Sequence, residues 1–287
     1  MKSLLPILFL LSAFPALGQL SVAMEINRSQ YVTGEAVLAT VTITNRSGRD
    51  LLLTSATQGT VAVSWLDFKV RDSRGRVVTR TTDAVFRAAQ IPPGQSMARE
   101  INLGNMFRVG NPDSYSVTAL VRDGNLTDGQ TYQSNAARFS VSDGRILFRQ
   151  PFGAPGTPAP EREYRVSAFN DGKRTSIYAS VMDAKGDYSL STFRLSEALL
   201  FRTPEATLDS KNRLHVLYLA NPTIFVHATV SQDGEVLNTE YFQRGQYTVP
   251  RLVPFTNGEI KVAGGVSYDP VAASKARNEA RKVTDRP

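Results

Sequence analysis

Short segments in which hydrophobic and polar residues alternate dominate the chain, and the clearest of them begins after Tyr31. From Val37 to Ile43, valine, alanine and isoleucine fall on one parity, and the threonines at 40, 42 and 44 fall on the other. A period of two residues is typical of a β-strand with one buried face. The turn-rich segment 45–50 then closes this strand, and a second apolar run follows. We take residues 31–53 as the element around which the first part of the chain is organised.

The same pattern continues over residues 20–143. Turn signals such as Ser73-Arg74-Gly75-Arg76 and Ile91-Pro92-Pro93-Gly94 separate the alternating runs, because proline presets φ and glycine permits a positive φ. About seven to nine strands over roughly 120 residues, without a helical period, predict a β-sandwich. The main expected strands are residues 20–26, 36–44, 51–53, 61–72, 96–103, 115–121 and 132–141.

The segment from Asn111 to Val117 resembles the tyrosine corner of immunoglobulin-like domains. In those domains a tyrosine stands two residues before the cysteine of the sixth strand. Tyr115 would be that tyrosine here, Val117 would replace the cysteine, and Trp65 could occupy the core. An ordinary strand start with a half-exposed tyrosine is the alternative.

Several motifs in this region carry a family resemblance. They are Tyr31-x-x-Gly34-Glu35, the strand ending Thr44-Asn45-Arg46-Ser47-Gly48, Phe68-x-Val70-x-Asp72-x-x-Gly75-x-Val77, Phe86, and Ile91-Pro92-Pro93-Gly94. Together they resemble bacterial immunoglobulin-like modules, nearest to the bacterial intracellular proteinase-inhibitor family, over residues 20–143. The resemblance implies the fold. We do not transfer the inhibitory activity to this chain, because these motifs consist of strand and turn residues without a chemical role. An export signal also does not suit an intracellular inhibitor.

Residues 144–162 are predicted to be a linker, since Pro151 to Pro160 contains four prolines and two glycines.

The second domain, residues 163–269, carries a weak internal repeat. Segment 168–193 aligns with segment 218–242 at a spacing of about 46–49 residues. This pattern resembles blades of sialidase-like or kelch-like propellers. Only about two and a third units fit, whereas a propeller needs about four blades. We therefore predict an incomplete, blade-like antiparallel domain of one sheet or two packed sheets. Chance similarity between two β-meanders is the alternative.

The two ends of the chain differ in character. Residues 1–18 predict a signal peptide, with Lys2, the apolar run from Leu4 to Leu11, and the cleavage motif Ala16-Leu17-Gly18; a buried N-terminal strand is the alternative. Residues 270–287 are small and charged and are predicted to be a basic disordered tail, with a transient helix over 272–283 as the alternative. No later segment reaches transmembrane length.

Charge and cysteine content narrow the functional classes. The net charge of +7 is dispersed apart from the tail, and the chain has no cysteine. An exported protein without disulfides and with two small β domains favours a bacterial envelope protein, periplasmic or extracellular. Cationic character permits attraction to anionic envelope polymers. No aromatic residues interleave with the basic tail, so nucleic-acid binding is not expected.

The sequence carries no recognised catalytic, cofactor or metal signature. We find no nucleophile elbow, phosphate loop or dinucleotide fingerprint. His215 and His227 are interpreted as half-buried sheet residues and not as metal ligands. Paired carboxylates for glycoside hydrolysis would have to come from scattered residues, namely Asp183, Asp187, Glu197, Glu205 and Asp209. We expect a non-enzymatic, exported module that binds an unknown protein or envelope polymer. A secreted proteinase inhibitor and a carbohydrate-active enzyme or accessory domain are the alternatives.

Overall fold

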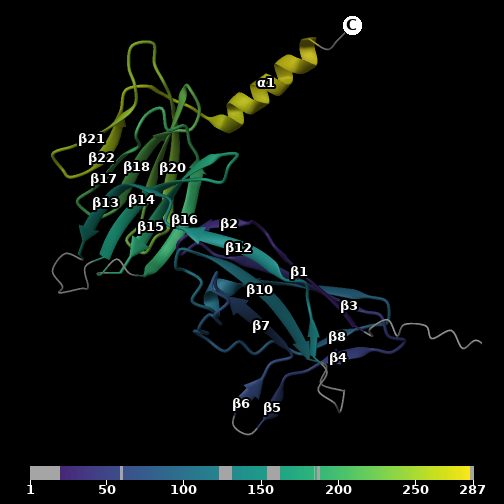
Figure 1. Ribbon diagram of the computed structural model, residues 1–287. Coiled ribbons are helices and arrows are strands. Elements are labelled where there is room, and N and C mark those ends of the chain that lie inside the picture. The colour runs from purple at the N-terminus through teal and green to yellow at the C-terminus, as the bar shows by residue number, and fades with distance from the viewer. Residues whose placement is uncertain are drawn as a thin grey trace, which may run out of the picture.

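The computed structural model describes residues 20–58, 61–122, 131–153, 162–183, 185 and 188–284. Within these residues the protein is almost entirely β-strand, as predicted, and forms two domains that meet between β12 and β13 (Figure 1). The expected signal peptide lies outside the described residues. In the part of the chain that is described, no helix has the length and apolar character needed to cross a membrane.

Two main sheets form the first domain, which also contains the two-stranded sheets β4-β8 and β5-β6. One has the order β1-β3-β9, and the other has the order β11-β10-β12-β2 with β7 on the opposite side of β10. β2 runs parallel to β12, and the other pairs are antiparallel. The first domain is therefore built from two β layers. The elements are β1 (Leu20–Ile26), β2 (Gln30–Val32), β3 (Leu38–Asn45), β4 (Leu51–Leu53), β5 (Ala56–Gln58), β6 (Val61–Val63), β7 (Leu66–Arg71), β8 (Ala89–Ile91), β9 (Ser96–Asn102), the 3-10 turn η1 (Leu103–Asn105), β10 (Asp113–Arg122), β11 (Thr131–Gln133) and β12 (Ala137–Ser142).

The organising strand is β3, which lies at the centre of the first sheet. Ala39, Val41 and Ile43 are fully buried, while the threonines between them are partly exposed. β3 pairs with β1 on one side and with β9 on the other. The predicted alternation is therefore confirmed, because one face of β3 packs on the core and the other faces water.

Tyr115 forms the predicted tyrosine corner at the start of β10. Its hydroxyl donates a hydrogen bond to the carbonyl oxygen of Asn111 at 2.7 Å, and its ring stacks on Phe139. Val117 is fully buried, in the same core as Trp65. A valine can take the cysteine's place because the contact it makes is apolar. The alternative of a half-exposed tyrosine is wrong, since Tyr115 is buried.

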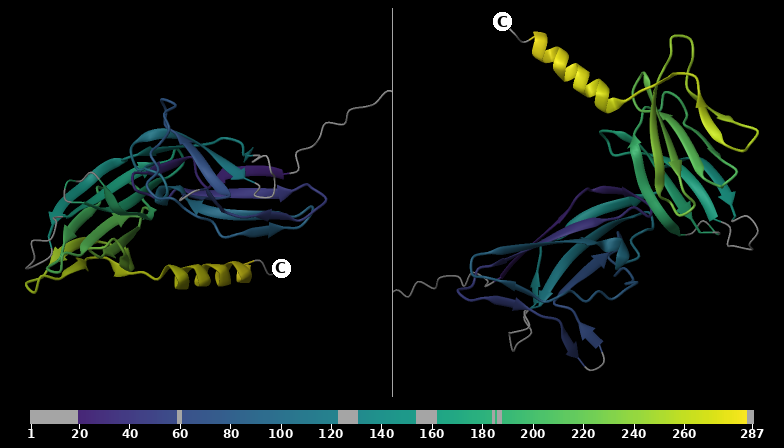
Figure 2. Two further views of the ribbon diagram at one scale, coloured as in Figure 1. Left: turned by 90° about the horizontal axis from the view of Figure 1, so that it is seen from below. Right: turned by 180° about the vertical axis from the view of Figure 1, so that it is seen from behind.

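Two antiparallel four-stranded meanders make up most of the second domain (Figure 2). The sheet β13-β14-β15-β16 faces the sheet β17-β18-β19-β20, which β23 extends. Val166 and Ile177 of the first sheet share one core with Val216 and Val226 of the second. The elements are β13 (Arg145–Phe152), β14 (Arg162–Asn170), β15 (Thr175–Met182), β16 (Ser189–Glu197), β17 (Glu205–Leu208), β18 (Leu214–Leu219), β19 (Ile224–Val230), β20 (Val236–Gln243), β21 (Arg251–Pro254), β22 (Ile260–Ala263) and β23 (Val266–Ser267).

These two meanders correspond to the predicted repeat. Residues 177–181 lie on β15 and residues 226–230 lie on β19, which are the third strands of the two sheets. The domain consists of two stacked open sheets, since no sheet among the described residues closes on itself; the likeness of these sheets to propeller blades stays a prediction. The remaining partial unit is the β21–β22 hairpin. It covers the outer face of the second sheet, where Leu252 and Val262 contact Leu217 and Phe225.

The boundary between the domains lies earlier than the predicted linker. Residues 144–162 were expected to be irregular, but Arg145–Phe152 forms β13 and pairs with β14 along its length. Pro151 fits there because β13 is an edge strand, and an edge strand can place a residue without an N–H group on its unpaired side. Only residues 143 and 144 separate β12 from β13. Residues 154–161 of the proline-rich stretch lie outside the described residues.

The tail forms the helix α1 (Pro270–Thr284) where we expected disorder over 270–287. The Asp269 carboxylate accepts hydrogen bonds from the backbone N–H groups of Val271 at 2.8 Å and Ala272 at 3.1 Å. Aspartate before the helix and proline at its first position are favourable start signals, and alanine, lysine, arginine and glutamate favour helix. α1 projects from the second domain (Figure 1). The prediction failed because we gave more weight to the missing apolar stripe than to these local signals.

Candidate functional site

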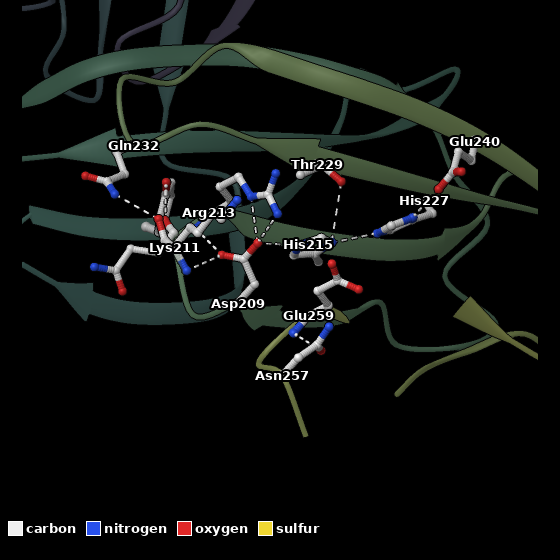
Figure 3. A network of polar contacts seen from close by, with 12 residues as sticks. Asp209, Lys211, Arg213, His215, His227, Thr229, Gln232, Glu240, Asn257 and Glu259 are labelled. Carbon is white, nitrogen blue, oxygen red and sulfur yellow. Dashed lines mark hydrogen bonds and ion pairs between the residues drawn. The ribbon is translucent and has the colours of Figure 1, made fainter. Parts of the chain in front are cut away.

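Two buried histidines meet on the outer face of the second sheet (Figure 3). In the β18–β19 hairpin, His215 pairs with Thr229 and His227 pairs with Leu217. The two histidines therefore share one face as diagonal neighbours. Their rings stack at a centroid distance of 5.2 Å, with Nδ1 of His215 2.9 Å from Nε2 of His227. Each residue is only 4% exposed.

Asp209 anchors one end of this pair. Its carboxylate accepts backbone N–H groups of Lys211 and Arg213 at 2.9 Å, forms a 2.6 Å ion pair with the Arg213 guanidinium, and lies 3.3 Å from Nε2 of His215. Burial alone would raise the pKa of Asp209, but these donors together lower it. The carboxylate is therefore held ionised beside His215.

Glu240 forms the other end, on the neighbouring strand β20. Its Oε2 lies 2.9 Å from Nδ1 of His227, and its side chain is 49% exposed. The four side chains Asp209, His215, His227 and Glu240 thus form a continuous polar chain from the interior to the surface, which we call the histidine chain. Such a chain can bind and pass protons. A substrate cannot reach the buried ring atoms while the hairpin covers this face.

The structure also places the candidate carboxylates. Asp209 joins the histidine chain. Glu197 forms ion pairs with two arginines, Glu205 pairs with Arg202, and Asp183 accepts a backbone N–H within its own turn. Asp187 lies outside the described residues. Each of these four described carboxylates thus has its own local partner, and no two of them form a paired set.

The pairing of the histidines was missed at the sequence level although a signal for it exists. Both histidines have odd numbers, so a hairpin centred on Pro222, which pairs odd-numbered residues with odd-numbered ones, puts them on one face. The interpretation as half-buried sheet residues was correct in kind, but both histidines are more buried than expected and contact each other.

A second candidate site is a cleft of about 420 Å³ at the junction of the two domains. The first domain contributes Arg28 and Ser29 from the β1–β2 connection and Gln30 from the start of β2. The second domain contributes residues of β14, β15, β16 and the β14–β15 turn. Arg28 is held between the domains: one nitrogen contacts Glu35 at 2.6 Å and another lies 3.5 Å from the Tyr178 hydroxyl. Burial raises the pKa of Tyr178, which keeps this hydroxyl protonated.

Basic side chains predominate in this cleft. Arg28, Lys173, Arg174 and Arg194 line it together with two acidic residues, Asp171 and Glu197. Two contacts fix the guanidinium of Arg194: its Nε donates to a serine hydroxyl at 2.9 Å, and another nitrogen lies 3.3 Å from Glu197. The cleft therefore presents oriented donors and a net charge of two positive units.

Comparison with known proteins adds little to this picture. No protein-family model and no curated protein matches the chain. Among solved structures, the chain is similar to the crystal structure of Spo0M, a sporulation control protein from Bacillus subtilis. The identity is 13% and the TM-score is 0.29, over 63% of this chain and 91% of that chain. At this TM-score the likeness carries no argument, so function has to be argued from the residues of this chain.

Proposed function

We propose that the protein is an exported, non-enzymatic binding module of the bacterial envelope, and that its ligand is the anionic part of an envelope polymer, held in the cleft between the two domains. The observation that carries this proposal is the convergence of basic side chains from both domains on one cleft of about 420 Å³. Domain junctions are common ligand sites. Arginine suits carboxylate, sulfate or phosphate groups because its planar donors can bind two oxygens together.

Preorganisation supports the same site. Arg194 and Arg28 are already held by neighbouring side chains, so binding would cost less side-chain entropy than it would with free arginines. The neighbouring acidic groups reduce the net charge, which favours binding of a polymer with spaced charges over tight binding of a single small anion.

The test measures binding of the purified protein to defined polymers by calorimetry. Polygalacturonate serves as the acidic probe and dextran as the neutral probe. We expect binding to polygalacturonate that weakens with salt and at least a roughly tenfold loss in Arg194→Gln. Arg99→Gln, which removes the same charge from β9 outside the cleft, is the control and should bind like the parent protein. Equal affinity for dextran, or equal behaviour of the two variants, would contradict the proposal.

Export is part of the proposal and rests on residues 1–18. Mass spectrometry of the protein from a periplasmic fraction should give a chain that starts at residue 19 or 20. Recovery of the uncleaved chain from the cytoplasm would contradict export.

A secreted proteinase inhibitor is the second candidate. The parallel β2–β12 pair and the tyrosine corner support a bacterial immunoglobulin-like module as the finer description of the first domain. The inhibitory function rests on the family resemblance alone. The purified protein can be assayed at micromolar concentration against serine, cysteine and metalloproteases, and inhibition of none of them would contradict the inhibitory function. A carbohydrate-accessory role, suggested by the blade-like sheets, would instead appear as binding to dextran in the calorimetric test.

A further inference from the structure

The histidine chain requires a defined number of protons. Three contacts link its four members, and each contact needs one hydrogen between two heavy atoms. Ionised carboxylates contribute none, so three of the four ring nitrogens must carry hydrogen. Two neutral imidazoles supply only two hydrogens. All three contacts are therefore satisfied together only when the pair holds one additional proton.

We propose that His215 and His227 share one stored proton near neutral pH, and that uptake of a second proton releases the β21–β22 hairpin from the second sheet. This would make the outer layer of the second domain an acid-sensitive cover. The proposal concerns a different region from the cleft and does not depend on the proposed function.

The second proton creates a conflict in the centre of the chain. With both rings charged, Nδ1 of His215 and Nε2 of His227 would each carry hydrogen and face each other at 2.9 Å. Two buried like charges at this distance repel strongly. The rings cannot separate along the sheet, because backbone pairing fixes β18 against β19. The free direction is outward, into the layer occupied by β21–β22.

The charges around the pair favour the first proton and disfavour the second. At the outer end, Glu240 faces His227 and balances the first proton. At the inner end, the ion pair with Arg213 already neutralises Asp209, so a second charge on His215 lacks a free counter-charge. The remaining charged groups of the elements packed around this face are Arg202 before β17, Glu205 on β17, Lys211 in the turn before β18, Arg251 on β21, Glu259 before β22 and Lys261 on β22.

Few polar contacts hold the hairpin in place. The backbone N–H of Ser210 donates to the carbonyl oxygen of Gly258 at 3.0 Å, and the N–H of Leu252 donates to Glu205 at 2.9 Å. Glu259 also interacts with the charge of Lys211 in the turn before β18, and the apolar contacts centre on Leu252 and Val262. Ser210 directly follows Asp209, so movement at the inner end of the chain acts on one of these polar attachments.

The direction of the His215 titration agrees with this geometry. Burial lowers the pKa of His215, and the neighbouring His227 lowers it further, against the opposing hydrogen bond to Asp209. The histidine pair therefore binds its second proton more weakly than its first, and this binding occurs on the acid side of the ordinary histidine range.

The experiment exploits the histidine content of the chain, which is two residues. Long-range ¹H–¹⁵N NMR of the purified protein, labelled at histidine, reports each ring nitrogen separately. We expect one shared proton at pH 7 and a second uptake below pH 6.5. Hydrogen exchange measured in parallel, corrected for intrinsic rates, should accelerate by at least about tenfold in β21–β22 across that uptake. Amides of β14 and β15 serve as the internal reference and should not change.

Two variants separate the proposal from a purely structural role. In Glu240→Gln the amide can donate to a neutral His227 nitrogen, so two neutral rings satisfy every contact. The first uptake should then move by about one pH unit or more to lower pH. In His227→Gln the second imidazole is gone, and exchange in the hairpin should become independent of pH. The proposal is overturned if both rings titrate independently in the parent protein and in Glu240→Gln, or if hairpin exchange ignores the second uptake.

Discussion

The two sheets of the second domain have the same strand order, but their outer faces differ. On the first sheet the outer face carries polar side chains beside Phe169, Tyr178 and Met182. Thr192 there donates a hydrogen bond to Ser180, and Arg194 donates one to Ser176. The first domain covers part of this face. On the second sheet the outer face combines the histidine chain with leucine and phenylalanine, and the chain's own hairpin covers it.

This difference shows how the two outer faces of a two-sheet stack are covered. In a closed ring of sheets, each sheet would cover the next. Here each terminal face needs a separate cover, and the chemistry of the face matches that cover. The polar face leaves hydroxyl and guanidinium groups available at the border with the first domain, where a ligand can reach them. The outer face of the second sheet is covered by the β21–β22 hairpin, and the histidine chain reaches the surface there only at Glu240.

The largest expected effect separates the inner and outer faces of β15. Ile177→Ala removes a fully buried side chain from the core shared by both sheets and should lower the free energy of unfolding by about 3–4 kcal/mol. Ser180→Ala, on the outer face of the same strand, should cost less than about 1 kcal/mol. Urea unfolding followed by circular dichroism measures both variants, and fluorescence of Trp65 in the first domain should not shift. Equal losses would mean that the faces do not differ as described.

A second experiment compares two aspartates that each organise a turn. Asp209→Asn removes a buried charge that faces Arg213 and His215, and should cost about 2 kcal/mol. Asp171→Asn is the control in the β14–β15 turn, where the carboxylate accepts two backbone N–H groups at the exposed edge of the cleft. Asparagine can keep these bonds, so little change in the melting temperature is expected there. A similar loss of stability in both variants would show that Asp209 contributes no more to folding than Asp171 does.

A third experiment alters the contact between the first domain and the outer face of the first sheet of the second domain. Gly34 has φ +81°, and a Cβ atom there would lie 2.3 Å from Cβ of Ser189 across the domain junction. Gly75 has nearly the same φ, +76°, with open space around it. Both alanine variants bear the same backbone strain of about 1–2 kcal/mol, but only Gly34→Ala should alter the small-angle scattering profile and weaken binding in the cleft. Identical profiles would show that this contact does not set the domain arrangement.

The smallest effect is a difference in the pH dependence of the two outer faces. The folded-state pKa of His215 is lowered from its ordinary value of 6.5, so on the acid side of that value the unfolded chain binds more protons at His215 than the folded chain does. Stability from this group is therefore complete above pH 6.5 and is lost as pH falls below it. Glu197, on the first sheet, has a pKa lowered from 4.5, chiefly by its hydrogen bond from Arg174, so its contribution is lost only at lower pH. Hydrogen exchange of β19 and β15 at pH 7, 5.5 and 4 should show β19 weakening first.

The first domain could be predicted from sequence because its signals are local. The alternation in β3 and the spacing of Tyr115 and Val117 each depend on neighbouring residues. The contact between His215 and His227 depends instead on the register of a hairpin, which combines two strands and their turn. β13 was missed because composition cannot distinguish an edge strand from a linker. The cleft brings Arg28 close to residues about 150 positions later in the chain. The alternation of residues along single strands cannot predict how the two domains pack together.

The joint between the domains consists of two residues, and both are held. The Asp143 carboxylate accepts a hydrogen bond from the Thr33 hydroxyl at 2.7 Å. Gly144 has φ +67° and lies so close to the backbone of Ala168 that a Cβ atom would be 2.9 Å from its carbonyl oxygen. Because both residues of the joint are held by such contacts, we expect the two domains to keep one orientation relative to each other. If the proposed function holds, a cleft of constant width between the two domains would also limit the thickness of the polymer chains that it could bind.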